Sequence, residues 1–174
     1  MVRALVDEAA LRDALRAEGV PVADAAAALA EMKARHVAAR APLEAVVLGA
    51  DQLLELDAEW LEKPLDLDAA AAQLRRLRGR RHRLVSAVVA FRGGERVWHH
   101  AATATLDLRP FSDAFLADYL AAAGPDILGC VGAYQIEGLG AQLMARVQGD
   151  HATIQGLPLL PLLQFLRDQG VLAA

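Results

Sequence analysis

Asp51 is the residue whose position in this sequence best suits acid–base chemistry. It directly follows the apolar run of residues 45–50, which has the composition of a buried strand. A carboxylate at the end of such a strand lies where α/β proteins commonly place reactive groups, and it could accept a proton from water or bind a cation. Aspartate also caps turns, so the pattern leaves both interpretations open.

Other polar residues could bind an anion, although each also has an ordinary structural interpretation. Lys63 precedes Pro64, whose ring restricts the backbone and could direct the ammonium group toward a ligand. The alternative is an exposed lysine in a loop. Glu8 and Lys33 lie on polar faces of predicted helices, where solvation is the usual explanation. Taken one at a time, these residues do not identify a site.

Several common functional motifs are absent from the sequence. It contains no GxxxxGK[ST] loop, and Gly138 and Gly140 lack the third glycine of a dinucleotide fingerprint. His99 and His100 are adjacent and would point to opposite faces of a strand, which favours a solvated hairpin over a metal site. Cys130, the single cysteine, excludes an internal disulfide and a Cys-rich zinc module, and a buried inert thiol is its simplest interpretation.

The composition is that of a folded protein. Of 174 residues, 55% are hydrophobic and 23% are charged, which provides ample material for a core. The net charge of −4 argues against a broad basic surface for nucleic acid or anionic lipid. Charges interrupt the apolar stretches well before the length that crosses a bilayer, and acidic residues stand where a signal peptide is apolar. We therefore predict a cytoplasmic protein that binds neither nucleic acid nor membrane.

The elements that must position these residues follow from hydrophobic spacing, caps and breakers. The predicted strands are residues 45–50 with a continuation to residue 56, a hairpin over residues 82–108 that turns at Gly93 and Gly94, and residues 142–147. The predicted helices are one capped by Asp7 and ended by Gly19, then residues 24–40, 67–77 capped by Asp66 and ended near Gly79, 113–122 capped by Ser112, and 158–166. This order indicates an α/β fold with a mixed sheet.

Six segments, taken together, carry more information than any of them alone. They are Lys33-Ala34, Gly49-Ala50-Asp51-Gln52, Lys63-Pro64 and residues 77–82, 132–138 and 156–158, and they occur in one order. This series resembles the Maf family of nucleoside triphosphate pyrophosphatases from Val6 to the C-terminus. The resemblance implies a Maf/ITPase-like α/β fold, with a mixed β-sheet flanked by helices. Residues 1–174 would form a single domain with two lobes around a deep cleft.

The resemblance also implies a reaction. Such enzymes cleave a nucleoside triphosphate between the α- and β-phosphates with the help of a divalent cation, Mg²⁺ or Mn²⁺. Asp51 matches the family's aspartate, proposed as general base and metal-site residue, and Glu8 matches the glutamate that helps to hold the metal. Lys33 and Lys63 match the lysines that face the triphosphate, and two lysines and a cation would neutralise its oxygens. The resemblance suggests a homodimer as the assembly.

Two departures from the commoner Maf pattern bear on the substrate. Gln52 stands where that pattern has threonine, and Glu137 stands where it has glutamine. These departures point to a subgroup, and residues 130–132 and 137–140 resemble the branch that prefers 7-methyl-GTP. A glutamate can accept hydrogen bonds from guanine N1–H and the exocyclic amine, and the cationic methylated base favours a carboxylate. Residues 135–136 differ from both branches, so dTTP or UTP remains an alternative substrate.

A third departure concerns the start of the chain. Family members begin with a strand and a Ser-x-Ser-x-x-Arg loop that clamps the phosphates, and this sequence starts where that segment ends. We therefore expect the first strand and the phosphate-clamp loop to be missing. One alternative function is a nucleotide-binding, catalytically weak protein with a role related to cell division. Another is a partial fold whose open sheet edge favours self-association.

Overall fold

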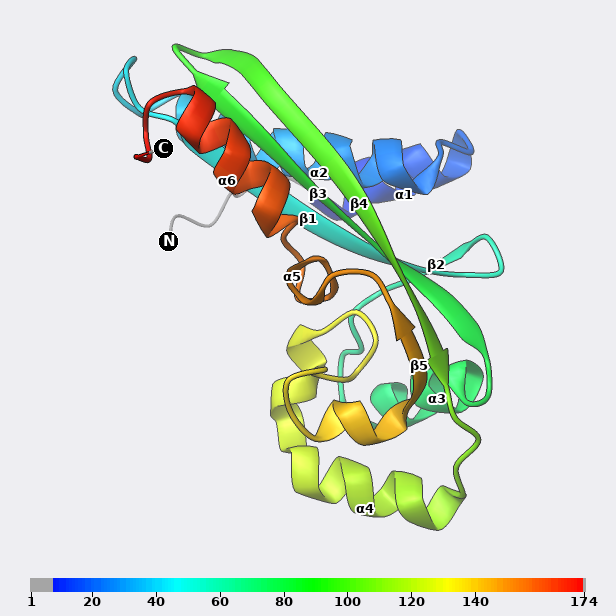
Figure 1. Cartoon of the computed structure of the whole chain (residues 1–174). Coiled ribbons are helices and arrows are strands. Elements are labelled where there is room, and N and C mark those ends of the chain that lie inside the picture. Colours follow the sequence, from blue (N-terminus) through cyan, green and yellow to red (C-terminus); the bar gives the residue numbers. More distant parts are fainter. Residues whose placement is uncertain (1–7, 174) are drawn as a thin grey trace. The chain divides into compact units, whose positions relative to one another are not determined.

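The computed structural model describes residues 8–173 and contains one five-stranded sheet with helices around it (Figure 1). In chain order the elements are α1 (Glu8–Ala17), α2 (Val22–Ala38), β1 (Val47–Leu56), β2 (Glu59–Leu61), α3 (Leu67–Leu77), β3 (Arg81–Arg92), β4 (Glu95–Leu108), α4 (Asp113–Ala123), the 3-10 helices η1 (Gly124–Gly129) and η2 (Leu139–Leu143), β5 (Met144–Gln148), α5 (His151–Ile154) and α6 (Leu159–Asp168). The sheet is antiparallel, in the order β2-β1-β3-β4-β5. The predicted α/β class, with a sheet flanked by helices, is confirmed, although the sheet is antiparallel and not mixed.

The chain divides into two compact units. Unit 1 comprises Met1–Gln52, Val85–Ala102 and Gly156–Ala174, and unit 2 comprises Leu53–Leu84 and Thr103–Gln155. The strands β1, β3 and β4 each contribute residues to both units. Of the predicted site residues, Glu8, Lys33, Asp51 and Gln52 belong to unit 1, and Lys63 and Glu137 belong to unit 2.

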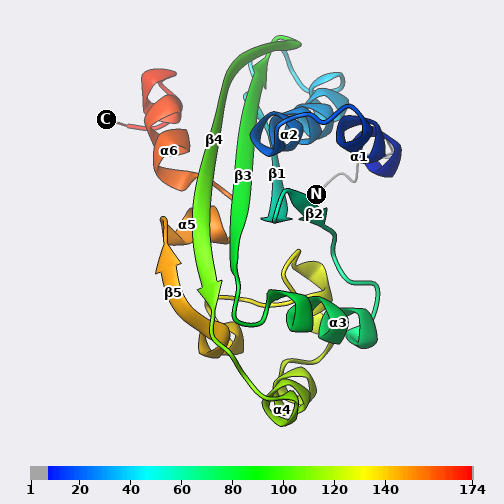
Figure 2. The same cartoon turned by 90° about the vertical axis from the view of Figure 1, so that its right-hand side faces the viewer.

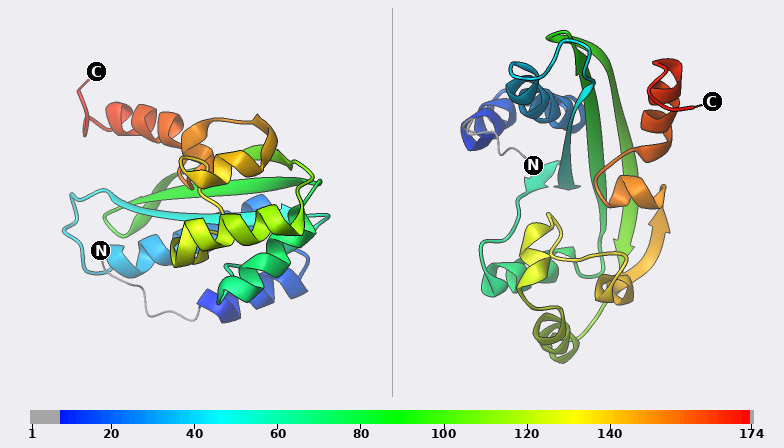
Figure 3. Two further views of the ribbon diagram at one scale, coloured as in Figure 1. Left: turned by 90° about the horizontal axis from the view of Figure 1, so that it is seen from below. Right: turned by 90° about the vertical axis from the view of Figure 1, so that its left-hand side faces the viewer.

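In unit 1, helices cover both faces of the strands. Figure 2 shows α2 on one face and α6 on the other. On the α6 face, Leu162 and Phe165 pack with Val88 and Ala90 of β3, and the Phe165 ring stacks on Trp98 with 4.7 Å between centroids. The buried residues of α2 are mostly alanines, which allow a helix to approach a strand closely. Helix α1 lies beside α2 (Figure 3).

Unit 2 has a larger aliphatic and aromatic core of its own. Leu74 and Leu77 of α3 are fully buried with Leu106 of β4 and Leu143 of η2. The predicted caps are both formed: the Asp66 side chain accepts from the Ala69 amide at 2.7 Å, and the Ser112 hydroxyl accepts from the Phe115 amide at 3.1 Å. These caps fix where α3 and α4 begin.

Three details differ from the sequence-based prediction. The second helix begins at Val22, directly after Pro21, rather than at Asp24, and Pro21 makes no side-chain cap. Asp51 lies inside β1 and not at its end, because the strand continues to Leu56. The short strand β2 was not predicted. It follows a tight turn in which Asp57 and Ala58 have positive φ angles of 51° and 66°, without a glycine to signal it.

The first predicted cap, Asp7, lies outside the described residues. The predicted hairpin over residues 82–108 is confirmed as β3 and β4, which are joined at Gly93 and Gly94. Within residues 8–173, none of the helices has both the length and the apolar character that crossing a membrane requires.

Candidate active site

Three of the predicted site residues meet in unit 1. The Lys33 ammonium donates to Asp51 Oδ1, and the same nitrogen lies 3.3 Å from Glu8 Oε2. Arg12, one turn after Glu8 on α1, donates from Nη2 to Glu8 Oε1 at 2.6 Å. The structure thus links α1, α2 and β1 through two carboxylates and two cations, which we call the Asp51 cluster.

The close packing of α2 on β1 explains how Lys33 reaches Asp51. A Cβ atom added to Gly49 would lie 2.2 Å from the Ala30 carbonyl oxygen and 2.8 Å from Ala34 Cβ. The backbone of β1 therefore touches the helix at Gly49. Because side chains alternate along a strand, Asp51 points to the same side as Gly49, and Lys33 stands between Ala30 and Ala34 on the helix.

Burial and the charge of Lys33 act in opposite directions on the pKa of the Asp51 carboxyl group. The residue is 8% exposed, and burial raises the pKa of its carboxyl group, whereas the hydrogen bond and charge of Lys33 oppose that rise. Its second oxygen, Oδ2, is buried and has no hydrogen-bond partner among the described residues. An unpaired carboxylate oxygen of this kind is costly unless another group, such as a cation or a water molecule, approaches it.

The donor set of the Asp51 cluster fits a hard divalent cation. Glu8 and Asp51 already converge on one positively charged atom, Lys33 Nζ, and carboxylate oxygens are the ligands that Mg²⁺ and Mn²⁺ prefer. Asp51 Oδ2 offers a free acceptor. No group of three His, Cys, Asp or Glu side chains within residues 8–173 is arranged to hold a metal. A cation bound by Glu8 and Asp51 would therefore need further oxygens from water or phosphate.

Gln52 is held in place by β3. Its side-chain amide donates to the Ser86 hydroxyl at 2.8 Å, and Ser86 is fully buried. A buried polar partner restricts the rotamers of Gln52 and orients its amide group.

Lys63 and Glu137 are both exposed residues of unit 2, and the charge of each affects the pKa of the Cys130 thiol. Burial raises the pKa of the Cys130 thiol, the negative charge of Glu137 raises it further, and the positive charge of Lys63 opposes the rise. The two residues therefore lie within electrostatic range of one thiol. The segment before Lys63 is tied to α3, because the buried Gln73 amide donates to the Glu62 carbonyl at 2.8 Å.

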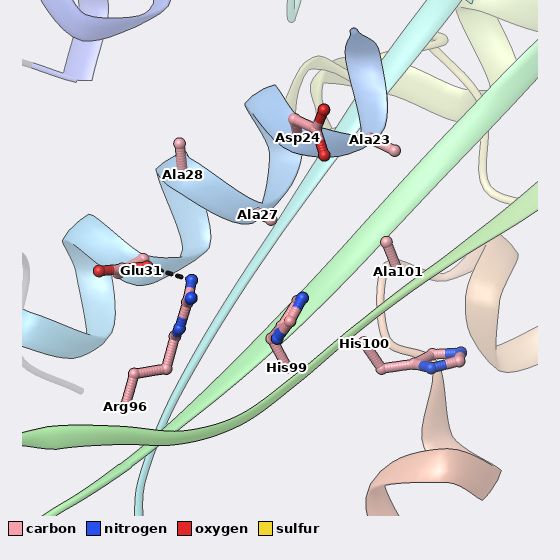
Figure 4. A pocket seen from close by; sticks show the side chains of 9 residues that line it. All are labelled: Ala23, Asp24, Ala27, Ala28, Glu31, Arg96, His99, His100 and Ala101. Carbon is pink, nitrogen blue, oxygen red and sulfur yellow. Dashed lines mark hydrogen bonds and ion pairs between the residues drawn. The ribbon is translucent and has the colours of Figure 1, made fainter.

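A groove of unit 1 lies elsewhere. It runs between α2 and β4 and is lined by alanines together with Asp24, Glu31, Arg96, His99 and His100 (Figure 4). Arg96 donates to Glu31 at 2.8 Å, and the two histidines point apart. None of the predicted site residues lines this groove, and the two carboxylates and the arginine that line it do not form a catalytic arrangement.

Sequence reasoning missed Arg12, Ser86 and Gln73. Arg12 stands four residues after Glu8, and this acid–base spacing on a helix is a signal that could have been used. Ser86 and Gln73 carry no local signal, because each acts on a residue from a different element.

Comparison with known proteins decides the family. The family described as Maf-like protein matches residues 1–169. The chain belongs to the Maf family. It is 54% identical over 167 residues to a nucleoside triphosphate pyrophosphatase of Rhodospirillum rubrum, a match that covers 96% of this chain and 82% of the relative.

Two further relatives of this Maf chain are informative. A 7-methyl-GTP pyrophosphatase of Rhizobium meliloti is 48% identical over 171 residues, which cover 98% of this chain and 85% of the relative. A nucleoside triphosphate pyrophosphatase of Granulibacter bethesdensis is 47% identical over 171 residues, which cover 98% of this chain and 86% of the relative. The resemblance inferred from the six ordered segments is thereby confirmed.

Proposed function

We propose that this Maf chain hydrolyses the bond between the α- and β-phosphates of a nucleoside triphosphate. Water would attack the α-phosphorus, the bond from that phosphorus to the bridging oxygen would break, and a nucleoside monophosphate and pyrophosphate would leave. The Asp51 cluster is the observation that carries the proposal, because it places a buried carboxylate with a free oxygen beside a lysine and a second carboxylate. The names of the relatives support the same reaction.

In this proposal Asp51 is the general base and Oδ2 is the atom that accepts the proton of the attacking water. Lys33 would exchange part of its contact with Asp51 and Glu8 for the phosphate oxygens, and Lys63 would add a second positive charge. Arg12 keeps Glu8 oriented and partly neutralised. A divalent cation held by Glu8 and Asp51 would supply the charge that stabilises the leaving pyrophosphate.

We further propose that the preferred substrate is 7-methyl-GTP. Glu137 is exposed, so its carboxylate is available to accept from both donors on the Watson–Crick edge of guanine. Gln52, oriented by Ser86, is the second residue assigned to base choice. A relative named 7-methyl-GTP pyrophosphatase, 48% identical to this chain, supports the choice, whereas other relatives carry only the general name.

The experiment is a panel of nucleoside triphosphates with Mg²⁺ or Mn²⁺, with separate measurement of pyrophosphate, orthophosphate and monophosphate. We expect equal amounts of pyrophosphate and monophosphate, and a kcat/KM for 7-methyl-GTP at least tenfold above that for GTP, dTTP and UTP. Release of orthophosphate would contradict the cleavage site. A preference for dTTP or UTP would contradict the substrate alone. A nucleotide-dependent rise in Tm without any turnover would instead identify a binding protein.

A further inference from the structure

One buried hydrogen bond ties the segment between η1 and η2 to strand β3. The Tyr134 hydroxyl lies 2.6 Å from His82 Nε2, and the two residues are 5% and 1% exposed. Burial lowers the pKa of His82 to about 4 and raises that of Tyr134, so at neutral pH the histidine is uncharged and the tyrosine keeps its proton. The bond therefore joins two neutral groups, the Tyr134 hydroxyl and His82 Nε2.

The residues around Tyr134 are held in one unusual conformation. Ala133 has a φ angle of 56°, which costs energy for any residue with a side chain, and its carbonyl accepts from the Tyr119 hydroxyl at 3.0 Å. Gly132 lies against the Tyr134 ring, since an added Cβ atom would be 2.3 Å from Cε1. At Gly140 an added Cβ atom would lie 2.5 Å from the Gln135 carbonyl oxygen. The segment is therefore closely packed at both of its ends, Gly132 and Gly140.

Exposure changes sharply along this segment. Residues 131–134 are buried, residues 135–136 are half-buried, and Glu137 is exposed only three residues after Tyr134. Because only three residues separate Glu137 from Tyr134 and the segment is closely packed at both ends, we expect the position of the Glu137 backbone to depend on where Tyr134 is held. The Cys130 thiol, at the other end of the segment, is close enough to sense the charge of Glu137.

We propose that the Tyr134–His82 hydrogen bond is a positioning device that fixes Glu137 for recognition of the base and so sets the nucleotide preference. The proposal rests on the proposed function, in which Glu137 selects the base. Neither Tyr134 nor His82 is assigned a contact with substrate, and their effect is transmitted through the backbone of residues 134–137. A hydrogen bond that served only the core would stabilise the protein without changing its preference.

The test uses Tyr134→Phe, which keeps the ring and removes only the hydroxyl, and a pair of variants at the other partner. His82→Gln retains a side chain that can form a hydrogen bond with the Tyr134 hydroxyl, whereas His82→Leu cannot form one. We expect Tyr134→Phe and His82→Leu to lower the kcat/KM ratio of 7-methyl-GTP to UTP at least fivefold, mainly through a higher KM for 7-methyl-GTP. His82→Gln should keep the ratio within twofold of the wild type.

Hydrogen exchange provides a readout that does not depend on turnover. Amides of residues 133–138 should exchange at least tenfold faster in Tyr134→Phe and His82→Leu than in the wild type. Phe165→Leu, in the core of unit 1, is the control for a general loss of stability. It should lower Tm without changing either exchange in this segment or the nucleotide ratio.

The outcomes separate this proposal from the proposed function. Unchanged exchange, or faster exchange with an unchanged nucleotide ratio, overturns the positioning role. An equal fall in kcat on every nucleotide also overturns it, because that result indicates a structural effect. If the wild type hydrolyses no nucleotide, the proposed function fails. The positioning role is then tested by the ratio of the dissociation constants of 7-methyl-GTP and UTP. If it binds neither nucleotide, both proposals fail.

Discussion

Lys33 and Asp51 are 18 residues apart in the sequence, yet the lysine ammonium donates directly to the buried aspartate carboxylate. The contact exists because α2 lies on β1 closely enough that Gly49 touches the helix backbone. A buried carboxylate needs a partner of this kind, since an isolated charge in the interior is strongly unfavourable. The packing of one helix on one strand and the charge balance of the candidate site are therefore a single structural feature.

Replacing Gly49 with alanine should disturb both the packing of α2 on β1 and the charge balance of the candidate site. The new methyl group would lie 2.2 Å from the Ala30 carbonyl oxygen, so α2 must move away from β1 and the Lys33–Asp51 ion pair must lengthen. We expect a loss of roughly 1–3 kcal/mol in the free energy of unfolding, the usual scale for overpacking, together with a clear loss of turnover. Urea denaturation and a pyrophosphate assay measure the two effects.

Gly129→Ala is the matched control for Gly49→Ala. An added Cβ atom at Gly129 has no neighbour within 4 Å, so its stability should stay within about 0.5 kcal/mol of the wild type. If Gly49→Ala were as stable and as active as Gly129→Ala, the contact between β1 and α2 would not be what places Lys33 against Asp51.

The Asp51→Asn variant separates chemistry from folding. Asparagine has nearly the same shape but cannot act as a base at neutral pH, so turnover should fall at least about a hundredfold while the protein remains folded. Asp107→Asn is the control, because Asp107 pairs with Arg81 in unit 2 and belongs to no proposed step. Normal pyrophosphate release by a folded Asp51→Asn protein would remove Asp51 from the mechanism.

The parts of the fold that sequence predicted correctly are those that depend on near neighbours. Asp66 and Ser112 cap helices through contacts only three residues away, and Gly93 and Gly94 turn the hairpin with φ angles of 60° and 83°. Such signals are complete within a few residues, so no knowledge of the rest of the molecule is needed.

Features that depend on distant contacts were not visible in the sequence. The apolar run ends at residue 50, and nothing near Asp51 in the sequence indicates that its buried charge is paired with Lys33 of another element. The Tyr134–His82 bond joins residues 52 positions apart and has no local signature. The meeting of Glu8, Lys33 and Asp51 was expected only through the resemblance to the Maf family, since each residue alone also suits an ordinary surface.

His82 should make the stability of the protein sensitive to mild acid. Its pKa is about 4 in the folded state against 6.5 as the ordinary value, because the buried ring is costly to protonate, an effect that the nearby Asp107 carboxylate partly offsets. A lowered folded-state pKa means that the unfolded chain binds the proton more readily. The stabilising contribution is therefore complete above pH 6.5 and is lost progressively as the pH falls toward 4.

The comparison is between wild type and His82→Gln, which cannot titrate in this range. Between pH 7 and pH 5 the wild type should lose about 2 kcal/mol more of its free energy of unfolding than the variant loses. Urea denaturation at the two pH values measures the difference. Equal losses in both proteins would mean that His82 accepts a proton in the folded state without cost. Tyr134 keeps its proton throughout this range, because burial raises its pKa.

Glu137→Gln tests whether the exposed carboxylate of unit 2 chooses the base. Glutamine replaces one of two acceptor oxygens with a donor, so one hydrogen bond to the guanine edge is lost and the attraction to the cationic 7-methylated ring disappears. A hydrogen bond to a charged group contributes about 1.5–3 kcal/mol, so the preference for 7-methyl-GTP over UTP should fall roughly ten- to a hundredfold.

Glu95→Gln, an exposed position at the hairpin, is the control for loss of one negative charge. The decisive comparison is the separate kcat/KM for each nucleotide. A selective fall with 7-methyl-GTP, and a gain with UTP, assigns Glu137 to the base, whereas an equal fall on both would place it among the residues that act on the phosphates.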